Sequence, residues 1–141
     1  MTSGPGPLAG LKVMVIDDSL TIRRSAELFL GQAGCRVILA EDGFDALAKI
    51  TDHEPAVIFV DILMPRLDGY QTCALIKKNA RFAGTPVIML SSRDGLFDRA
   101  RGRMVGSDDY VTKPFTREAL MKAIAAARAA APGGSEKAPA P

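Results

Sequence analysis

Five short runs of mostly apolar, β-branched residues divide the chain, and each is followed by a stretch with helical spacing. The runs occupy residues 12–16, 36–40, 57–61, 87–90 and 109–112. Most are continuously apolar rather than alternating, which is typical of strands that are buried on both faces. Such strands form parallel sheets with helices on each side. The sequence therefore predicts an α/β fold, with a doubly wound five-stranded parallel sheet and helices on both faces.

The two ends of the chain differ in composition from its middle. Residues 1–10 are rich in Gly, Pro and Ser, and residues 129–141 are rich in Ala, Pro and Gly, so both segments are expected to be disordered. Residues 11–128 have the length of one domain that needs no disulfide or structural metal. No effector domain is expected after them.

Charge and hydropathy exclude several classes of protein. The formal net charge of +2 is too small to indicate nucleic acid as the main partner. The two cysteines lie outside any Cys/His cluster, which favours buried thiols without a redox or metal role. No apolar run approaches the roughly 18 residues of a membrane span, and the N-terminus lacks the features of a signal peptide. A cytoplasmic protein without membrane insertion is expected.

Polar residues stand at the ends of four predicted strands. Asp17 and Asp18 follow the first strand, Asp61 ends the third, and Ser91 and Lys113 follow the fourth and fifth. Because parallel strands end at the same edge of a sheet, these side chains are expected to converge there. Three carboxylates at one edge repel one another, so the pKa of at least one should be raised unless a cation intervenes.

This combination of groups is suited to phosphoryl transfer. Mg²⁺ is the hard cation that suits a few carboxylates, waters and a phosphoryl group. Lys113 adds a fixed positive charge, Ser91 adds a hydroxyl, and Asp61 is a nucleophile able to form an aspartyl-phosphate. Each residue alone has an ordinary role as a cap or surface residue, so the prediction depends on their coincidence. A Gly-rich phosphate loop is absent from the sequence, which disfavours nucleotide binding.

The chain resembles response regulator receiver domains over residues 11–128. The resemblance lies in the acidic pair after the first strand, VDILMPRLDG around Asp61, Ser91 after VIML, and YVTKPF at residues 110–115. The segments KVMVIDDSLTIRRSAE and MPRLDGYQTCALIK are similar to the PilG-type receivers of type IV pilus twitching-motility systems. The resemblance implies a flavodoxin-like fold with strand order 2-1-3-4-5.

The resemblance also implies the chemistry of the strand ends. Asp61 would accept a phosphoryl group from a histidine kinase or a histidine phosphotransfer domain. Asp17, Asp18, Asp61 and the backbone carbonyl of Leu63 would hold Mg²⁺. Phosphorylation and dephosphorylation would be self-catalysed, so the chain would not be an enzyme acting on separate substrates.

The remaining positions would bind and report the phosphoryl group. Ser91 would hydrogen-bond it and Lys113 would pair with it, while Tyr110 would turn inward when Ser91 moves. Pro114 would follow a cis peptide bond, which suits a tight turn that aims Lys113 inward. An apolar residue at Leu63 cannot orient an attacking water molecule, so we predict a long-lived phosphoryl group.

An arginine-rich stretch follows the fourth strand and has two interpretations. It is either a solvated helix face or an output surface for a partner, with Phe97, Arg99 and Arg103 as candidate contacts. Arg93, two residues after Ser91, is expected to flank the path of water to the phosphoryl group.

The leading hypothesis is a stand-alone response regulator of a two-component phosphorelay, which controls type IV pilus extension and twitching motility by protein contact. One alternative is a haloacid-dehalogenase-like phosphatase, which is disfavoured because such enzymes have a second aspartate where this chain has Leu63. Others are a chemotaxis-type receiver with a different output, and a nucleic-acid binder that uses the arginine cluster.

Overall fold

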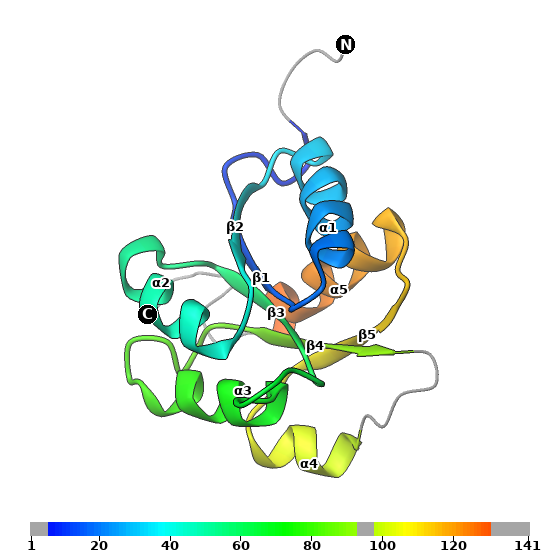
Figure 1. Ribbon diagram of the computed structural model, residues 1–141. Coiled ribbons are helices and arrows are strands. Elements are labelled where there is room, and N and C mark those ends of the chain that lie inside the picture. Colours follow the sequence, from blue (N-terminus) through cyan, green and yellow to red (C-terminus); the bar gives the residue numbers. More distant parts are fainter. Residues whose placement is uncertain (1–5, 93–97, 131–141) are drawn as a thin grey trace.

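A single five-stranded parallel sheet forms the centre of the molecule (Figure 1). The computed structural model describes residues 6–92 and 98–130. The strand order is β2-β1-β3-β4-β5, which confirms the predicted topology. The strands are β1 (Lys12–Ile16), β2 (Arg36–Ala40), β3 (Val57–Asp61), β4 (Val87–Ser92) and β5 (Asp109–Lys113).

Helices cover both faces of the sheet, as predicted. Helices α1 and α5 lie on one face, and α2 and α3 lie on the other, with α4 beside α3 and β5 (Figure 1). The described helices are α1 (Leu20–Gln32), α2 (Gly43–His53), α3 (Gly69–Lys78), α4 (Arg99–Met104) and α5 (Arg117–Ala130). None of them has the length and apolar character needed to cross a lipid bilayer.

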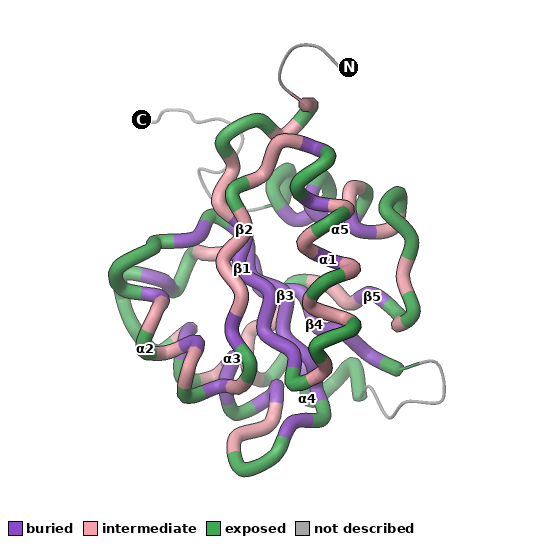
Figure 2. The backbone as a smooth tube through the Cα atoms, turned by 45° about the horizontal axis from the view of Figure 1, so that its top comes forward, coloured by how far each residue is buried: buried purple, intermediate pink, exposed green. Residues whose placement is uncertain are grey.

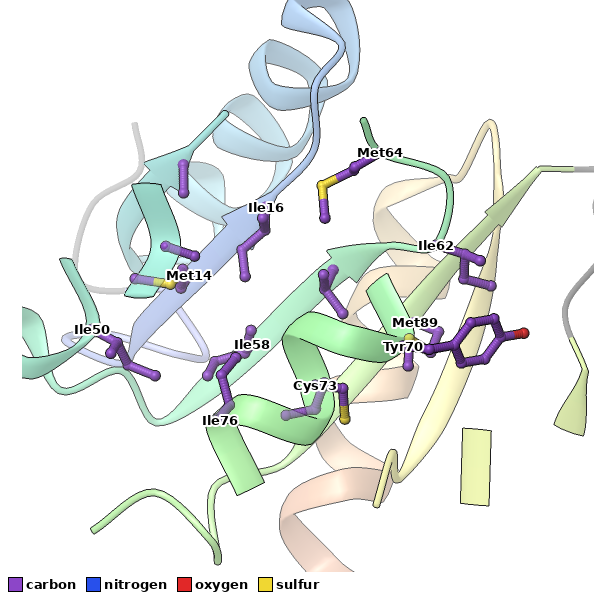
Figure 3. Close-up of a cluster of buried hydrophobic side chains, with 14 of the residues drawn as sticks. Met14, Ile16, Ile50, Ile58, Ile62, Met64, Tyr70, Cys73, Ile76 and Met89 are labelled. Carbon is purple, nitrogen blue, oxygen red and sulfur yellow. The ribbon is translucent and has the colours of Figure 1, made fainter. Parts of the chain in front are cut away.

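The sheet separates two apolar cores because successive strand residues point to opposite faces. Met14 and Ile16 of β1 pack toward α2 and α3, whereas Val13 and Val15 pack toward α1 and α5. All five residues of β3 are buried, so the central strand is the most enclosed part of the sheet (Figure 2). Figure 3 shows the core beneath α3, where Ile58 lies close to the side chains of that helix.

Side-chain caps start three helices directly after the sheet edge at which the strands end. Ser19 caps α1 by accepting a hydrogen bond from the backbone of Ile22 at 3.3 Å. Asp42 caps α2, and Asp68 caps α3 in a reciprocal capping box with Gln71. The caps fix where each connecting loop ends, and the loops after β1 and β3 border the candidate site.

The structure corrects some sequence expectations. Residues 6–10, which fall in the segment expected to be disordered, form turns in which the Leu8 amide donates to the Ala33 carbonyl at 2.8 Å, and Leu8 packs against the α1/α5 core. Helix α5 continues to Ala130, two residues beyond the predicted domain end. Phe44 of α2 and Leu75 of α3 are exposed apolar side chains, whereas Ala46, Ile50, Cys73 and Ile76 of the same helices are buried in the core. Residues 1–5 and 131–141 of the expected disordered segments lie outside the described residues.

Candidate functional site

The carboxyl ends of four strands meet at one edge of the sheet, and each brings a polar side chain. Asp17 follows β1 directly, Asp61 is the last residue of β3, Ser91 is the next-to-last residue of β4, and Lys113 is the last residue of β5. The parallel register of β3 with β4 and of β4 with β5 keeps these ends level. The structure thus brings the four strand ends together where the sequence placed them.

Asp17, Asp18 and Asp61 form an acidic cluster. Their carboxylate oxygens lie within 4.8 Å of one another; Asp17 and Asp61 are buried, and Asp18 is exposed. The backbone amide of Ser19 donates to Asp17 Oδ1 at 2.9 Å, and Arg23 donates to the Asp17 carbonyl oxygen at 2.6 Å. The first turn of α1 therefore fixes the position of the acidic pair.

Lys113 joins two of the three carboxylates. Its Nζ donates to Asp61 Oδ1 at 3.0 Å and to Asp17 Oδ2 at 3.1 Å. Charge-assisted hydrogen bonds of this length fix both the ammonium and the rotation of the carboxylates. One ammonium facing three carboxylates leaves the cluster with an excess of negative charge.

The electrostatics of the cluster follow from its burial. Burial raises the pKa of Asp61 to about 6, the charge of Asp17 adds to the rise, and Lys113 opposes it. Burial also raises the pKa of Asp17, against the effect of its bonds to Ser19 and Lys113. Burial alone would lower the pKa of Lys113, but its hydrogen bond to Asp61 and the charge of Asp17 outweigh that effect and raise it.

A cleft of about 190 Å³ opens beside these groups. Asp18, Asp61, Ser91 and Lys113 supply polar atoms to its lining. Leu63 lines the same cleft although it is 59% exposed, so it stands at the boundary with solvent. The cleft is thus lined by carboxylates, an ammonium and a hydroxyl, with an apolar side chain beside them.

Ser91 and Tyr110 lie on neighbouring strands. Ser91 is buried, and its hydroxyl donates to the backbone carbonyl of the next residue at 3.3 Å, a long bond that a better acceptor can replace. Tyr110 is half-buried, and the guanidinium of Arg99 stacks on its ring at 4.4 Å and donates to its hydroxyl. The Lys113–Pro114 peptide bond is cis.

The candidate output surface is described only in part. Arg99 and Arg103 are exposed on α4. Phe97 and Arg93 lie outside the described residues. A cleft of about 640 Å³ between β5 and α5 is lined in part by Arg99, Tyr110 and Lys122. Its lining includes none of the polar residues Asp18, Asp61, Ser91 and Lys113 that line the smaller cleft.

The acidic cluster fits a Mg²⁺ ion. Its ligand atoms are carboxylate oxygens, which hard divalent cations prefer, and they are close enough to share one ion. Asp18 is exposed, so water molecules can complete an octahedral coordination sphere. The excess negative charge of the cluster supplies the electrostatic reason for a cation to bind.

Sequence reasoning missed a group of residues that connects the loop after β3 to helix α2. Arg66 in this loop donates to Asp42 Oδ2 at 2.7 Å, and its guanidinium lies 5.1 Å from the ring centroid of Phe44. The two carboxylate oxygens of Asp42 have different partners, since Oδ1 accepts from the amide of Asp45. The sequence signals only a helix cap at Asp42, because the partner is 24 residues away in the chain.

The fold and the acidic edge define a class of signalling proteins. The family model described as "Response regulator receiver domain" matches residues 13–125, and the chain belongs to this family. Protein PilG of Pseudomonas aeruginosa is 72% identical over 117 residues, which cover 83% of this chain and 87% of that protein. This similarity supports the PilG-type assignment made from the sequence. Because the chain belongs to the receiver family, the alternative of a haloacid-dehalogenase-like phosphatase is set aside.

More distant relatives share the domain but not its length. A probable transcriptional regulator, ycf27, of Guillardia theta is 40% identical over 115 residues, which cover 82% of this chain but 44% of that protein. The chain thus corresponds to less than half of that relative.

Solved structures have the same fold. The chemotaxis protein CheY4 of Vibrio cholerae superposes with a TM-score of 0.80 at 32% identity, over 84% of this chain and 99% of that chain. The receiver domain of a sensor histidine kinase from Pseudomonas aeruginosa gives a TM-score of 0.76 at 28% identity, over 84% and 98% of the two chains. That receiver has a magnesium ion coordinated in its active-site cleft.

Proposed function

We propose that the chain is a phosphorylation-controlled switch of a two-component phosphorelay, in which Asp61 accepts the phosphoryl group. The observation that carries the proposal is the position of Asp61, which is buried at the end of β3 and hydrogen-bonded to Lys113 at 3.0 Å. Asp61 also lines a cleft of about 190 Å³ with the hydroxyl-bearing Ser91. Membership of the receiver family supports the same assignment.

In the proposed reaction, an Asp61 oxygen attacks the phosphorus of a phosphohistidine on a histidine kinase or a histidine phosphotransfer domain. A P–O bond forms while the P–N bond breaks, and the departing imidazole takes up a proton from solvent. Lys113 holds Asp61 Oδ1 before transfer and pairs with the phosphoryl oxygens afterwards. When bound by Asp17, Asp18, Asp61 and the carbonyl oxygen of Leu63, Mg²⁺ would neutralise developing negative charge on the phosphoryl group.

Two side chains, Ser91 and Tyr110, would transmit the phosphorylation of Asp61 to helix α4. The Ser91 hydroxyl would exchange its 3.3 Å bond to a backbone carbonyl for a bond to the phosphoryl group. Tyr110 on the adjacent strand would then move inward and change its contacts with Arg99, which is the first residue of α4. Such a two-state element couples a local charge to a remote surface, here the candidate output surface of Phe97, Arg99 and Arg103.

The switch would reset itself by hydrolysis. Water attacks the phosphorus, the acyl-phosphate P–O bond breaks, and inorganic phosphate leaves while the Asp61 carboxylate is regenerated. The chain would therefore catalyse its own phosphorylation by a phosphodonor and its own dephosphorylation.

Incubation with Mg²⁺ and acetyl phosphate tests the site. Intact-mass analysis should show one added phosphoryl group on the wild type and none on Asp61→Ala. Labelling should also stop when Mg²⁺ is removed with a chelator. Labelling that persists in Asp61→Ala would contradict the assignment of the phosphoacceptor.

We place the output in type IV pilus extension and twitching motility, through contact with a downstream pilus-motility protein. The support is 72% identity to Protein PilG, because the sequence resembles the twitching-motility group of receivers. Expression in a Pseudomonas aeruginosa strain that lacks this relative should restore twitching. Failure to restore twitching, together with rescue of swimming chemotaxis in a strain that lacks its chemotaxis receiver, would favour the alternative of a chemotaxis-type receiver with a different output.

A further inference from the structure

The loop between β3 and α3 leaves the sheet edge directly after Asp61 and returns to it at Gly69. The Gly69 amide donates to the Ile62 carbonyl at 2.8 Å and closes the loop. A Cβ on Gly69 would lie 2.4 Å from the Asp61 carbonyl oxygen, so the end of the loop rests on the backbone of Asp61. Leu63, whose carbonyl is the proposed metal ligand, lies inside this loop. The position of the loop therefore bears directly on the site.

The outer part of the loop has a strained backbone at Arg66. The Leu67 amide donates to the Pro65 carbonyl at 2.7 Å, and Arg66 between them has φ 69°. A three-residue turn with positive φ at its centre is a rare and strained form, and a residue with a side chain rarely adopts it. Strained backbone persists where surrounding contacts hold it.

The side chain of Arg66 supplies such a contact. Its Nη2 donates to Asp42 Oδ2 at 2.7 Å, and its guanidinium lies 5.1 Å from the centroid of the Phe44 ring. Asp42 is itself fixed, since its Oδ1 caps α2 through the Asp45 amide at 2.7 Å. Leu67 adds a contact beside it, because its side chain would lie 2.7 Å from a Cβ on Gly43. The first turn of α2 is therefore a platform for the loop.

We propose that Arg66 is a positioning residue for the metal and phosphoryl site, and that it acts by tethering the β3–α3 loop to Asp42 and Phe44. This inference rests on the proposed function, since the loop is argued to place the Leu63 carbonyl for Mg²⁺. Outer contacts that orient metal ligands typically change metal affinity by 10- to 100-fold when removed. The loss of a tether cannot change the Mg²⁺ affinity by more than the interaction free energy of the tether itself. Here the partly exposed ion pair and the cation–π contact can each change that affinity by up to roughly fivefold. We expect Arg66→Ala to weaken Mg²⁺ binding by about three- to tenfold.

Electrostatics alone would give the opposite result for Arg66. Removing a positive charge near a cation site strengthens cation binding, whereas loss of the tether weakens it. Arg66→Gly tests the backbone separately, because glycine adopts positive φ without strain but has no side chain to hold Asp42. Asp42→Asn keeps an amide oxygen for the cap of α2 and removes the ion pair. All three variants should bind Mg²⁺ more weakly than the wild type.

Arg81 offers a matched control. It pairs with Glu54, and its guanidinium lies 5.3 Å from the Phe82 ring centroid, so it makes the same two kinds of contact. Arg81 follows the C-terminal end of α3, whereas the loop after Asp61 leads into the N-terminal end of that helix. Arg81 therefore lies outside the site. Arg81→Ala should leave the Mg²⁺ dissociation constant unchanged.

The experiment is titration calorimetry with Mg²⁺ at fixed ionic strength, alongside labelling by acetyl phosphate. Unchanged or tighter binding in Arg66→Ala, or equal weakening in Arg81→Ala, would overturn the tether. Absence of labelling in the wild type would instead remove the proposed function, so the two failures are distinguishable. Thermal unfolding without Mg²⁺ separates the effects: a merely structural role lowers the melting temperature and leaves the Mg²⁺ affinity as it was.

Discussion

At the scale of single residues, the site combines fixed charges with one apolar neighbour. Lys113 holds Asp17 and Asp61 at 3.1 and 3.0 Å, so these three side chains have little freedom. Leu63 lines the same cleft with an exposed side chain that offers no hydrogen bond to water. The chemistry at Asp61 and the access of water to it are therefore set by different residues.

Leu63 should slow the loss of the phosphoryl group. A polar side chain at this position can orient an attacking water molecule, so Leu63→Asn should speed dephosphorylation by roughly three- to tenfold, a small part of what a positioned base can supply. Leu63→Ala is the control for lost bulk without a polar group. The measurement is decay of the labelled protein by intact mass after acetyl phosphate is removed. Decay in Leu63→Asn that is unchanged or slower would contradict the prediction.

At the scale of elements, α4 is attached differently from the other helices. Among its residues only Gly102 is buried, and Met104 is 85% exposed. Its contacts with the rest of the molecule include two stacked pairs, Arg99 on Tyr110 at 4.4 Å and Arg101 on Tyr70 at 4.3 Å. A helix without an apolar face gains little from burial, so α4 should open more readily than the helices that pack on the cores.

The Tyr70 hydroxyl should control how readily α4 opens. It accepts a hydrogen bond at 2.8 Å from the amide of Asp98, which caps this helix. Tyr70→Phe keeps the ring under Arg101 and removes the acceptor. Since one such bond contributes about 0.5–1.5 kcal/mol, amide exchange in residues 98–106 should accelerate by roughly two- to tenfold. Hydrogen-exchange mass spectrometry tests this, with α2 as the internal control; equal acceleration in both helices, or none in α4, would refute it.

Elements with strong local signals could be predicted, and contacts between distant loops could not. The strand ends at Asp17 and Asp61 were predictable because parallel topology alone brings them together. The boundaries of α4 (Arg99–Met104) could not be predicted, since its polar sequence RARGRM lacks the apolar stripe from which periodicity predicts a helix. The Arg66–Asp42 pair escaped prediction because it depends on the path of a loop with positive φ rather than on periodicity.

At the scale of the whole molecule, the acidic edge opposes folding while the two cores support it. Burial raises the pKa of Asp61 from 3.8 to about 6, so between these values the folded chain binds a proton that the unfolded chain releases. Stability from this group is therefore fully present below pH 3.8 and is lost as the pH rises through 6. At neutral pH the ionised group should disfavour the metal-free fold by roughly 1 to 3 kcal/mol.

Replacing Asp61 should consequently stabilise the metal-free protein. We expect Asp61→Asn to raise the free energy of unfolding at pH 7.5 by roughly 1 to 3 kcal/mol, and by much less at pH 4.5, where the wild-type group is mostly protonated. Mg²⁺ should narrow the difference, since an ion that binds only the folded state stabilises it by mass action and the variant lacks one ligand. Urea unfolding of both proteins is measured at the two pH values, with chelator or with Mg²⁺. Each of these four conditions gives one difference in the free energy of unfolding between the variant and the wild type. A variant less stable than the metal-free wild type at pH 7.5, or a difference that grows toward low pH, would show that Asp61 does not carry this charge penalty.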